Sequence, residues 1–267
     1  MPTRKKIITF AVLGLIAMGL GYWYGMPEGG SGGGGGNGDP KPPEFLKEGL
    51  VAYYPFNGNA KDESGNGYEG TQKGGVTYVQ DRFGKSSSAC SFDGKDDYIH
   101  VDKPLELIDA NECTVLAWMH PLETTMGIQH QILGKVMGEG RNSMSISHNN
   151  IFWYANGNAG SFKTSPECPN CWHISSKVGL GNGWRHVAGT WKRNGGKIFV
   201  TLFINGEAIQ SAMSGLLKNP NDSHIILGST SVDNTYCRGI LDNLRIYNRA
   251  LSEVQVKALY EFEKVKD

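Results

Sequence analysis

Residues 198–210, IFVTLFINGEAIQ, carry the strongest local structural signal in the chain. A run of apolar and β-branched residues ends at Ile204, Asn205-Gly206 follows, and a second short apolar run starts at Ala208. Asn-Gly is a preferred dipeptide of the two-residue turns that join antiparallel strands. The segment therefore predicts a β-hairpin made by residues 198–204 and 208–210.

Similar short runs continue on both sides of this hairpin, and turn signals such as Asn57-Gly58 and Asp93-Gly94 separate them. Their spacing is typical of an antiparallel sandwich or jelly roll rather than of a parallel α/β sheet. We expect an all-β, two-sheet antiparallel fold. Its other expected strands are residues 50–55, 89–93, 98–101, 113–120, 131–136, 144–147, 151–154, 185–192, 225–227 and 240–247.

One helix is predicted after the last strand. Ser252 is a good N-cap, Gln255 completes a capping box, and Leu251 with Val256 forms a hydrophobic staple. Val256, Leu259 and Tyr260 then share one face. We expect a short helix over residues 252–263, lying against the edge of the sandwich.

The first 26 residues predict a single transmembrane helix. Arg4, Lys5 and Lys6 precede an uncharged run from Ile7 to Tyr24, which spans roughly 27 Å as a helix, enough to cross a hydrocarbon core. Positive charges stay on the cytoplasmic side, so the rest of the chain is expected to be extracytoplasmic. A cleaved signal peptide has the same pattern and would instead release a secreted protein.

A linker is expected over residues 27–48. From Gly29 to Gly38 it contains only glycine apart from Ser31 and Asn37, so it cannot bury apolar surface and behaves as a flexible coil. The prolines that follow stiffen the chain. A single globular domain is then expected over residues 49–267.

The net charge is zero, and the sequence contains no basic field or motif for nucleic acid. Five cysteines cannot all be paired within one chain. Cys168 and Cys171 are candidates for a local disulfide. Pairing with more distant cysteines, or a thiolate metal site that includes His173, are the alternatives.

Several segments together resemble laminin-G-like jelly-roll domains of the concanavalin A-like lectin/glucanase superfamily. The resemblance begins at residues 49–60 and 62–67, continues through 92–99, 114–119, 184–188 and 202–206, and ends at residues 239–252. It implies a jelly-roll fold in which the strand around Trp118 buries its tryptophan. It says little about function, because this fold hosts lectins, glycosidases, adhesins and structural modules.

The resemblance also implies a structural calcium ion, with Asp62 and Asp242 at the matching acidic positions. Calcium requires six to eight oxygen ligands, and carbonyl groups from residues 57–67 are available near Asp62. Asn243 stands where many relatives have a second aspartate, which lowers the charge of such a site. The alternative is that Asp62 caps a turn and Asp242 pairs locally.

No catalytic centre is predicted. The paired carboxylates of glycosidases on one strand, Glu-x-Asp-x-Glu, are absent, as are Gly-x-Ser-x-Gly, a Walker loop and His-Glu-x-x-His. The sequence therefore favours a binding protein over a hydrolase.

The ligand-binding residues expected are Trp172, His173, Trp153 and Tyr154, in and beside an insertion that precedes Trp184. Loops on a rigid sandwich commonly carry specificity, and we expect Trp172 to be the main apolar anchor. The predicted function is a membrane-tethered, extracytoplasmic, adhesin- or lectin-like module that recognises glycan or another extracellular surface. The alternative is a structural or assembly component that binds a partner protein of the cell envelope.

Overall fold

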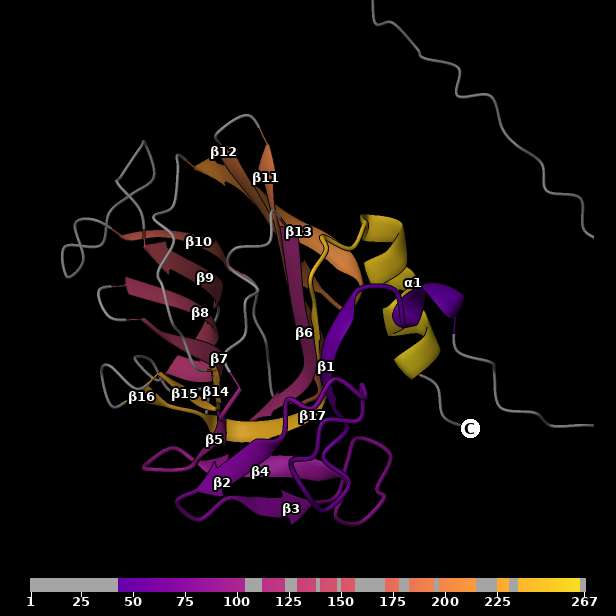
Figure 1. Ribbon diagram of the computed structural model, residues 1–267, viewed down its shortest axis with the longest axis vertical. Coiled ribbons are helices and arrows are strands. Elements are labelled where there is room, and N and C mark those ends of the chain that lie inside the picture. The colour runs from indigo at the N-terminus through magenta and orange to yellow at the C-terminus, as the bar shows by residue number, and fades with distance from the viewer. Residues whose placement is uncertain are drawn as a thin grey trace, which may run out of the picture. The chain divides into compact units, whose positions relative to one another are not determined.

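Two antiparallel sheets stacked face to face form the body of the protein, as a computed structural model shows (Figure 1). It describes residues 43–103, 112–122, 129–137, 140–147, 150–156, 171–177, 183–194, 197–214, 225–230 and 235–264. The predicted transmembrane helix lies outside these residues. Among the described residues, no helix is both long and apolar enough to cross a membrane.

The first sheet has eight strands. Seven follow one path: β13 (Glu207–Ser214), β12 (Lys197–Ile204), β11 (Arg185–Asn194), β6 (Glu112–Pro121), β17 (Arg238–Tyr247), β4 (Ala89–Asp93) and β3 (Thr77–Val79). The eighth, β1 (Leu50–Tyr54), pairs with the second half of β17, whose first half pairs with β4.

The second sheet has seven strands, in the order β10 (Cys171–Lys177), β9 (Asn150–Asn156), β8 (Gly140–Ser147), β7 (Gln129–Met137), β14 (Ile225–Leu227), β5 (Tyr98–Val101) and β2 (Gly70–Lys73). A small ladder of β15 (Ser229–Thr230) and β16 (Thr235–Tyr236) lies beside it. The all-β sandwich predicted from the sequence is confirmed.

The main hydrophobic core fills the space between the two sheets. Strand alternation explains its composition, because successive residues of a strand point to opposite faces. In β5, Ile99 and Val101 are fully buried in this core, whereas Tyr98 and His100 are only half-buried. Met119 and Leu241 belong to the same core from the first sheet.

A second core covers the outer face of the eight-stranded sheet. Helix α1 (Glu253–Lys264) places Val256 and Leu259 there, against Leu116 of β6 and Phe203 of β12. Figure 1 shows α1 on the side of this sheet that faces away from the seven-stranded sheet. The expectation that the helix lies against the edge of the sandwich was therefore wrong. The outward-facing residues of these strands are apolar, and the helix packs over them and shields them from water.

The local signals at this helix and at the hairpin are confirmed. Gln255 N–H donates to the Ser252 hydroxyl at 3.3 Å, and Ser252 N–H donates to the Gln255 side-chain oxygen at 3.0 Å. In the hairpin, Ile204 pairs with Glu207 across the turn, and Asn205 and Gly206 have φ of 49° and 77°. Both values lie in the region that Asn and Gly tolerate.

Residues 44–46, which fall in the predicted linker, form a short 3₁₀ helix, η1 (Glu44–Leu46). Leu46 is buried in the second core, and its carbonyl accepts a hydrogen bond from the Tyr247 hydroxyl at 3.1 Å. The chain is thus fixed to the domain a few residues before β1 begins.

Candidate functional site

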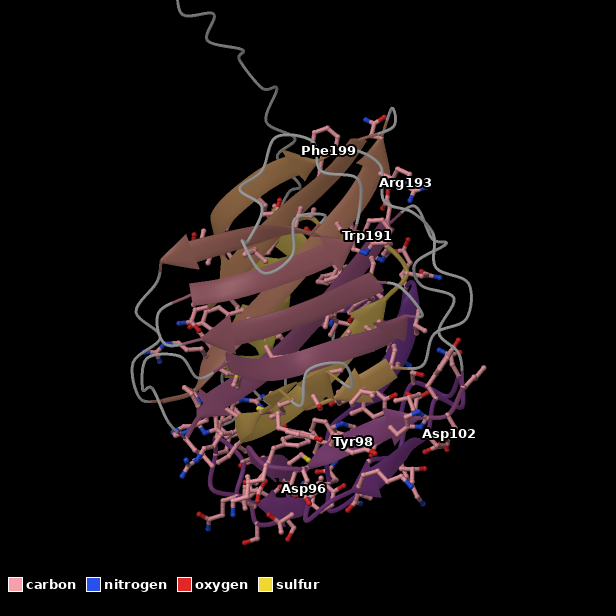
Figure 2. The ribbon with its side chains drawn as sticks, turned by 90° about the vertical axis from the view of Figure 1, so that its left-hand side faces the viewer. Asp96, Tyr98, Asp102, Trp191, Arg193 and Phe199 are labelled. Carbon is pink, nitrogen blue, oxygen red and sulfur yellow. The ribbon has the colours of Figure 1, made fainter. Side chains whose placement is uncertain are left out.

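An open depression of about 490 Å³ lies at one end of the sandwich, where β4, β6, β16 and β17 meet. Its lining combines apolar, charged and aromatic side chains: Ser91, Phe92, Asp93, Gly94, Lys95, Leu122, Tyr236 and Arg238. We call it the rim depression. The turn between β4 and β5 forms one wall, and Figure 2 shows Asp96 of this turn at the end of the molecule opposite Phe199.

Aspartate side chains hold this turn in place. Asp93 accepts a hydrogen bond from Lys95 N–H at 2.8 Å, and Asp97 accepts one from Asp93 N–H at 2.8 Å. The other carboxylate oxygen of the buried Asp97 accepts Gly75 N–H. Ligand oxygens of Asp93, Asp96 and Asp97 lie within 4.8 Å of one another, the one such grouping among the described residues. The hydrogen bonds show that Asp93 and Asp97 cap the turn.

The first residue of β17, Arg238, forms the opposite wall. Arg238 pairs with Asp93 in the β4–β17 ladder, and its stem lies over Gly94. A Cβ atom at Gly94 would stand 2.8 Å from the Arg238 Cβ, and Gly94 has a φ of 83°. Glycine is therefore required there both for the turn and for the close approach of the arginine.

Apolar groups complete the rim depression. Leu122 is 50% exposed, and its N–H donates to the Arg238 carbonyl at 3.1 Å, which fixes it beside the arginine. Tyr236 of β16 is half-buried and pairs with Ser229. The next residue, Cys237, is buried and donates its N–H to Gly228 at 2.7 Å. The tyrosine thus directly precedes a residue of the main hydrophobic core.

This combination suits a ligand with an apolar face and polar edges. Binding sites for small molecules are concave surfaces that pair apolar and aromatic lining with a few fixed polar groups. A tyrosine offers a flat apolar ring and a polar hydroxyl in one side chain. Sugar rings present the same two kinds of surface, C–H faces and hydroxyl edges.

Asp62, a predicted calcium ligand, is already engaged by donors from its own loop and from β1. Its carboxylate accepts N–H groups of Tyr53 at 2.9 Å, Ser64 at 2.9 Å and Tyr68 at 3.0 Å, together with the Ser64 hydroxyl at 2.8 Å. Burial alone would raise the pKa of Asp62, but these hydrogen bonds outweigh burial and lower it.

The second predicted calcium ligand, Asp242, is buried and forms an ion pair with Arg82, whose side chain is 7% exposed. Burial raises the pKa of Asp242 to about 7, against the opposing attraction of Arg82. Within the described part of the chain, neither Asp62 nor Asp242 belongs to a group of three possible metal ligands. Calcium binding by this pair stays a prediction.

The predicted ligand-binding residues belong to β9 and β10, the last two strands at one edge of the seven-stranded sheet. His173 of β10 pairs with Tyr154 of β9, and Trp172 pairs with Ala155. Trp172 and His173 were expected in an insertion, but residues 171–177 form strand β10. The alternating Trp172-His173-Ile174-Ser175 pattern permits this extra strand. Trp153 of β9 pairs with Ile174. A binding role for these residues stays a prediction.

Four of the five cysteines lie in the described part of the chain. Cys90, Cys113 and Cys237 are free and buried in the described part of the chain. Cys171 begins β10, whereas Cys168 lies outside the described residues. The expected Cys168–Cys171 disulfide therefore stays a prediction.

Three residues of the rim depression were missed by sequence reasoning: Leu122, Tyr236 and Arg238. Asp93-Gly94 was identified only as a turn. The position of Arg238, directly before the closing strand motif at residues 239–252, is the one signal that could have drawn attention to it. The rim depression forms only because the β4–β17 ladder brings distant segments together.

Comparisons with solved structures show jelly-roll binding domains. The receptor binding domain of botulinum neurotoxin C/D mosaic serotype has a TM-score of 0.63 and 18% identity, over 83% of this chain and 53% of that one. The binding domain of Paraclostridial Mosquitocidal Protein 1 has a TM-score of 0.61 and 25% sequence identity, over 80% of this chain and 52% of that one. The chain thus spans about half the length of these two binding domains. A search of curated proteins found no match.

A third structure is matched over nearly its whole length. Domain 4 of AbnA, a GH43 extracellular arabinanase from Geobacillus stearothermophilus, was solved in complex with arabinotriose. It has a TM-score of 0.57 and 25% identity, over 79% of this chain and 98% of that one.

The fold of this chain is the jelly roll that these binding domains also adopt. The family can also be stated. Residues 93–257, more than half of the chain, match the laminin G family model described as "Concanavalin A-like lectin/glucanases superfamily", and the chain belongs to this family.

Proposed function

We propose that this protein is an extracytoplasmic, non-enzymatic binding module that recognises glycan through the rim depression. The observation that carries this proposal is the meeting of Tyr236 and Leu122 with Arg238 and Asp93 in one open hollow. Apolar rings and side chains can cover the C–H face of a sugar, while the guanidinium and the carboxylate can bind its hydroxyl groups.

The relative that is solved with arabinotriose supports a saccharide ligand, because this chain matches nearly all of that domain. The proposal also includes attachment to the membrane through residues 1–26, with signal cleavage and secretion as the alternative. A structural calcium ion at Asp62 and Asp242 remains part of the proposal. The partner is a glycan or a protein of an extracellular surface.

An assembly role would instead require a broad apolar contact surface. In the described part of the chain, the exposed large apolar side chains lie on separate elements: Phe83, Leu122, Phe199 and Val254. Figure 2 places Phe199 far from the turn that carries Asp96. This distribution favours a local ligand site over a protein docking face.

Tyr236→Ala is expected to weaken saccharide binding by roughly 1–3 kcal/mol, about a 5- to 150-fold rise in Kd, because it removes the aromatic surface of the rim depression. The full chain would first be screened on a glycan array that includes arabino-oligosaccharides. The strongest ligand would then be titrated calorimetrically against both proteins.

Phe199→Ala is the matched control, since it removes an exposed ring at the other end of the domain and should leave Kd unchanged. Melting temperatures of both variants exclude general unfolding. Unchanged affinity in Tyr236→Ala, together with a loss in Trp172→Ala, would move the site to β10. If the array shows no glycan binding at all, the proposed function is wrong.

A further inference from the structure

One arginine, Arg249, holds the short segment that precedes β1. Its guanidinium donates to the main-chain carbonyl groups of Phe45 at 2.9 Å and Glu48 at 2.6 Å. It also donates to the side-chain oxygen of Gln255 at 3.2 Å. Hydrogen bonds from a charged donor are stronger than those between neutral groups. Arg249 therefore joins residues 43–49 to the first turn of helix α1.

Further contacts fix the same segment at both of its ends. Leu46 is buried in the second core, and Tyr247 donates its hydroxyl to the Leu46 carbonyl at 3.1 Å. At Gly49, the carbonyl accepts the N–H of Asn248 at 2.9 Å. Gly49 has a φ of 72°, and a Cβ atom there would stand 2.7 Å from the Asn248 side-chain oxygen, so glycine permits this close approach. We call residues 43–49 and 247–255 together the N-terminal clasp.

The N-terminal clasp and the rim depression lie at opposite ends of β17. Arg238, the first residue of β17, lines the rim depression, whereas Tyr247, the last, pairs with Leu50 of β1. A strand of this length spans about 30 Å. Figure 1 shows the indigo segment before β1 lying beside α1. Strands β1 and β17 are antiparallel, and their hydrogen bonds run across the strand direction. A pull between the rim depression and residue 43 therefore acts largely along both strands and loads these bonds together.

We propose that the N-terminal clasp carries mechanical force from the preceding segment into the sandwich, so that the domain stays folded under tension. Residues 43–49 precede Leu50, and the clasp must therefore open before force reaches the β1–β17 pair. This inference goes beyond the proposed function, because the clasp requires no ligand. A source of tension would be the proposed attachment through residues 1–26, acting against a ligand held on another surface.

Magnetic tweezers at constant force test this on the full chain, held at its N-terminus and at a bio-orthogonally reactive residue in place of the exposed Lys95. We expect a first step of at most about 25 Å, the extended length of residues 43–49, before the domain unfolds. Arg249→Gln should shorten the lifetime before the first step about tenfold or more, because it removes the charged donor. Lys257→Gln is the control, since Lys257 is an exposed residue of α1 that pairs with Glu207 outside the clasp.

Leu46→Ala is a second variant, which removes the apolar contact and should also shorten this lifetime. Lifetimes that stay the same in Arg249→Gln and Leu46→Ala would overturn the inference, as would release of residues 43–49 at the lowest force applied. A single unfolding step whose lifetime still falls in Arg249→Gln would support it. Should neither variant fold, the force at which the first step occurs in the unmodified chain decides. No saccharide is present in these measurements, so their failure would leave the proposed function in place, and a negative glycan array would leave the clasp in place.

Discussion

Glu263→Ala is expected to lower the free energy of unfolding by about 3–5 kcal/mol, the cost typical of breaking a buried ion pair by removing one partner. Glu263, near the end of α1, is only 5% exposed. One of its carboxylate oxygens binds the buried Arg245, and the other accepts the indole N–H of Trp118 at 2.8 Å. The variant would leave both of these buried donors without this acceptor.

Urea denaturation at pH 7 measures this loss. Glu261→Ala is the matched control, because Glu261 is exposed on the same helix and pairs with Lys264. It should change stability by less than about 1 kcal/mol, as is usual for surface ion pairs. A double change of Arg245 and Glu263 to methionine should recover much of the loss, since it removes both charges. A cost below 1 kcal/mol for Glu263→Ala would show that the end of α1 is not fixed to the sheet.

His186→Phe is expected to become more stable relative to the unmodified protein as the pH falls, by about 2–3 kcal/mol between pH 7.5 and pH 4.5. His186 is fully buried, and neither ring nitrogen has a hydrogen-bond partner. Burial lowers the pKa of His186 to about 4; Glu263 opposes this shift, and Arg245 and Arg82 add to it. Its ordinary value is about 6.5.

The sign follows from proton binding. As the pH falls through 6.5, the unfolded chain takes up a proton at His186 while the folded chain does not, so stability is lost down to about pH 4. Phenylalanine cannot take up this proton. It can also replace the imidazole sterically, because the His186 ring already packs against two aromatic rings, with centroid distances of 5.4 Å to Trp118 and 5.8 Å to Tyr260.

The measurement is urea denaturation of both proteins at several pH values from 4.5 to 7.5. Taking the difference between the two curves cancels the other groups near the helix, among them Asp242, whose pKa is also shifted. Curves that stay parallel over this range would show that His186 titrates normally and is accessible to water in the folded protein.

The sequence predicted those parts of the fold that depend on local signals. Asn205-Gly206 fixed a hairpin turn, and Ser252 with Gln255 fixed the start of a helix, because both act within a few residues. Five strands were missed, β2, β3, β10, β15 and β16, and they lack a long apolar run. β2 reads Gly-Thr-Gln-Lys and has mostly exposed side chains, so no hydrophobic period marks it.

The sequence did not predict contacts between segments that are far apart in the chain. Trp118 was expected to be buried in its strand, and it is, but under α1 on the outer face of the sheet rather than between the sheets. Likewise, the residues of the rim depression come from the β4–β5 turn, the end of β6 and the segment from β16 to β17. Nothing in the local sequence indicates that Arg238 will pair with Asp93. That contact depends on strand order and register, which are set by the whole fold.

Amide chemical-shift mapping of the labelled protein, titrated with the strongest saccharide from the array, tests most directly the central claim that this jelly roll binds glycan at the rim depression. We expect the largest shifts at residues 91–95, at Leu122 and at residues 236–238, in agreement with the lining of the rim depression. Shifts confined to β9 and β10, or to the face of β5 that carries Tyr98 and His100, would contradict the claim.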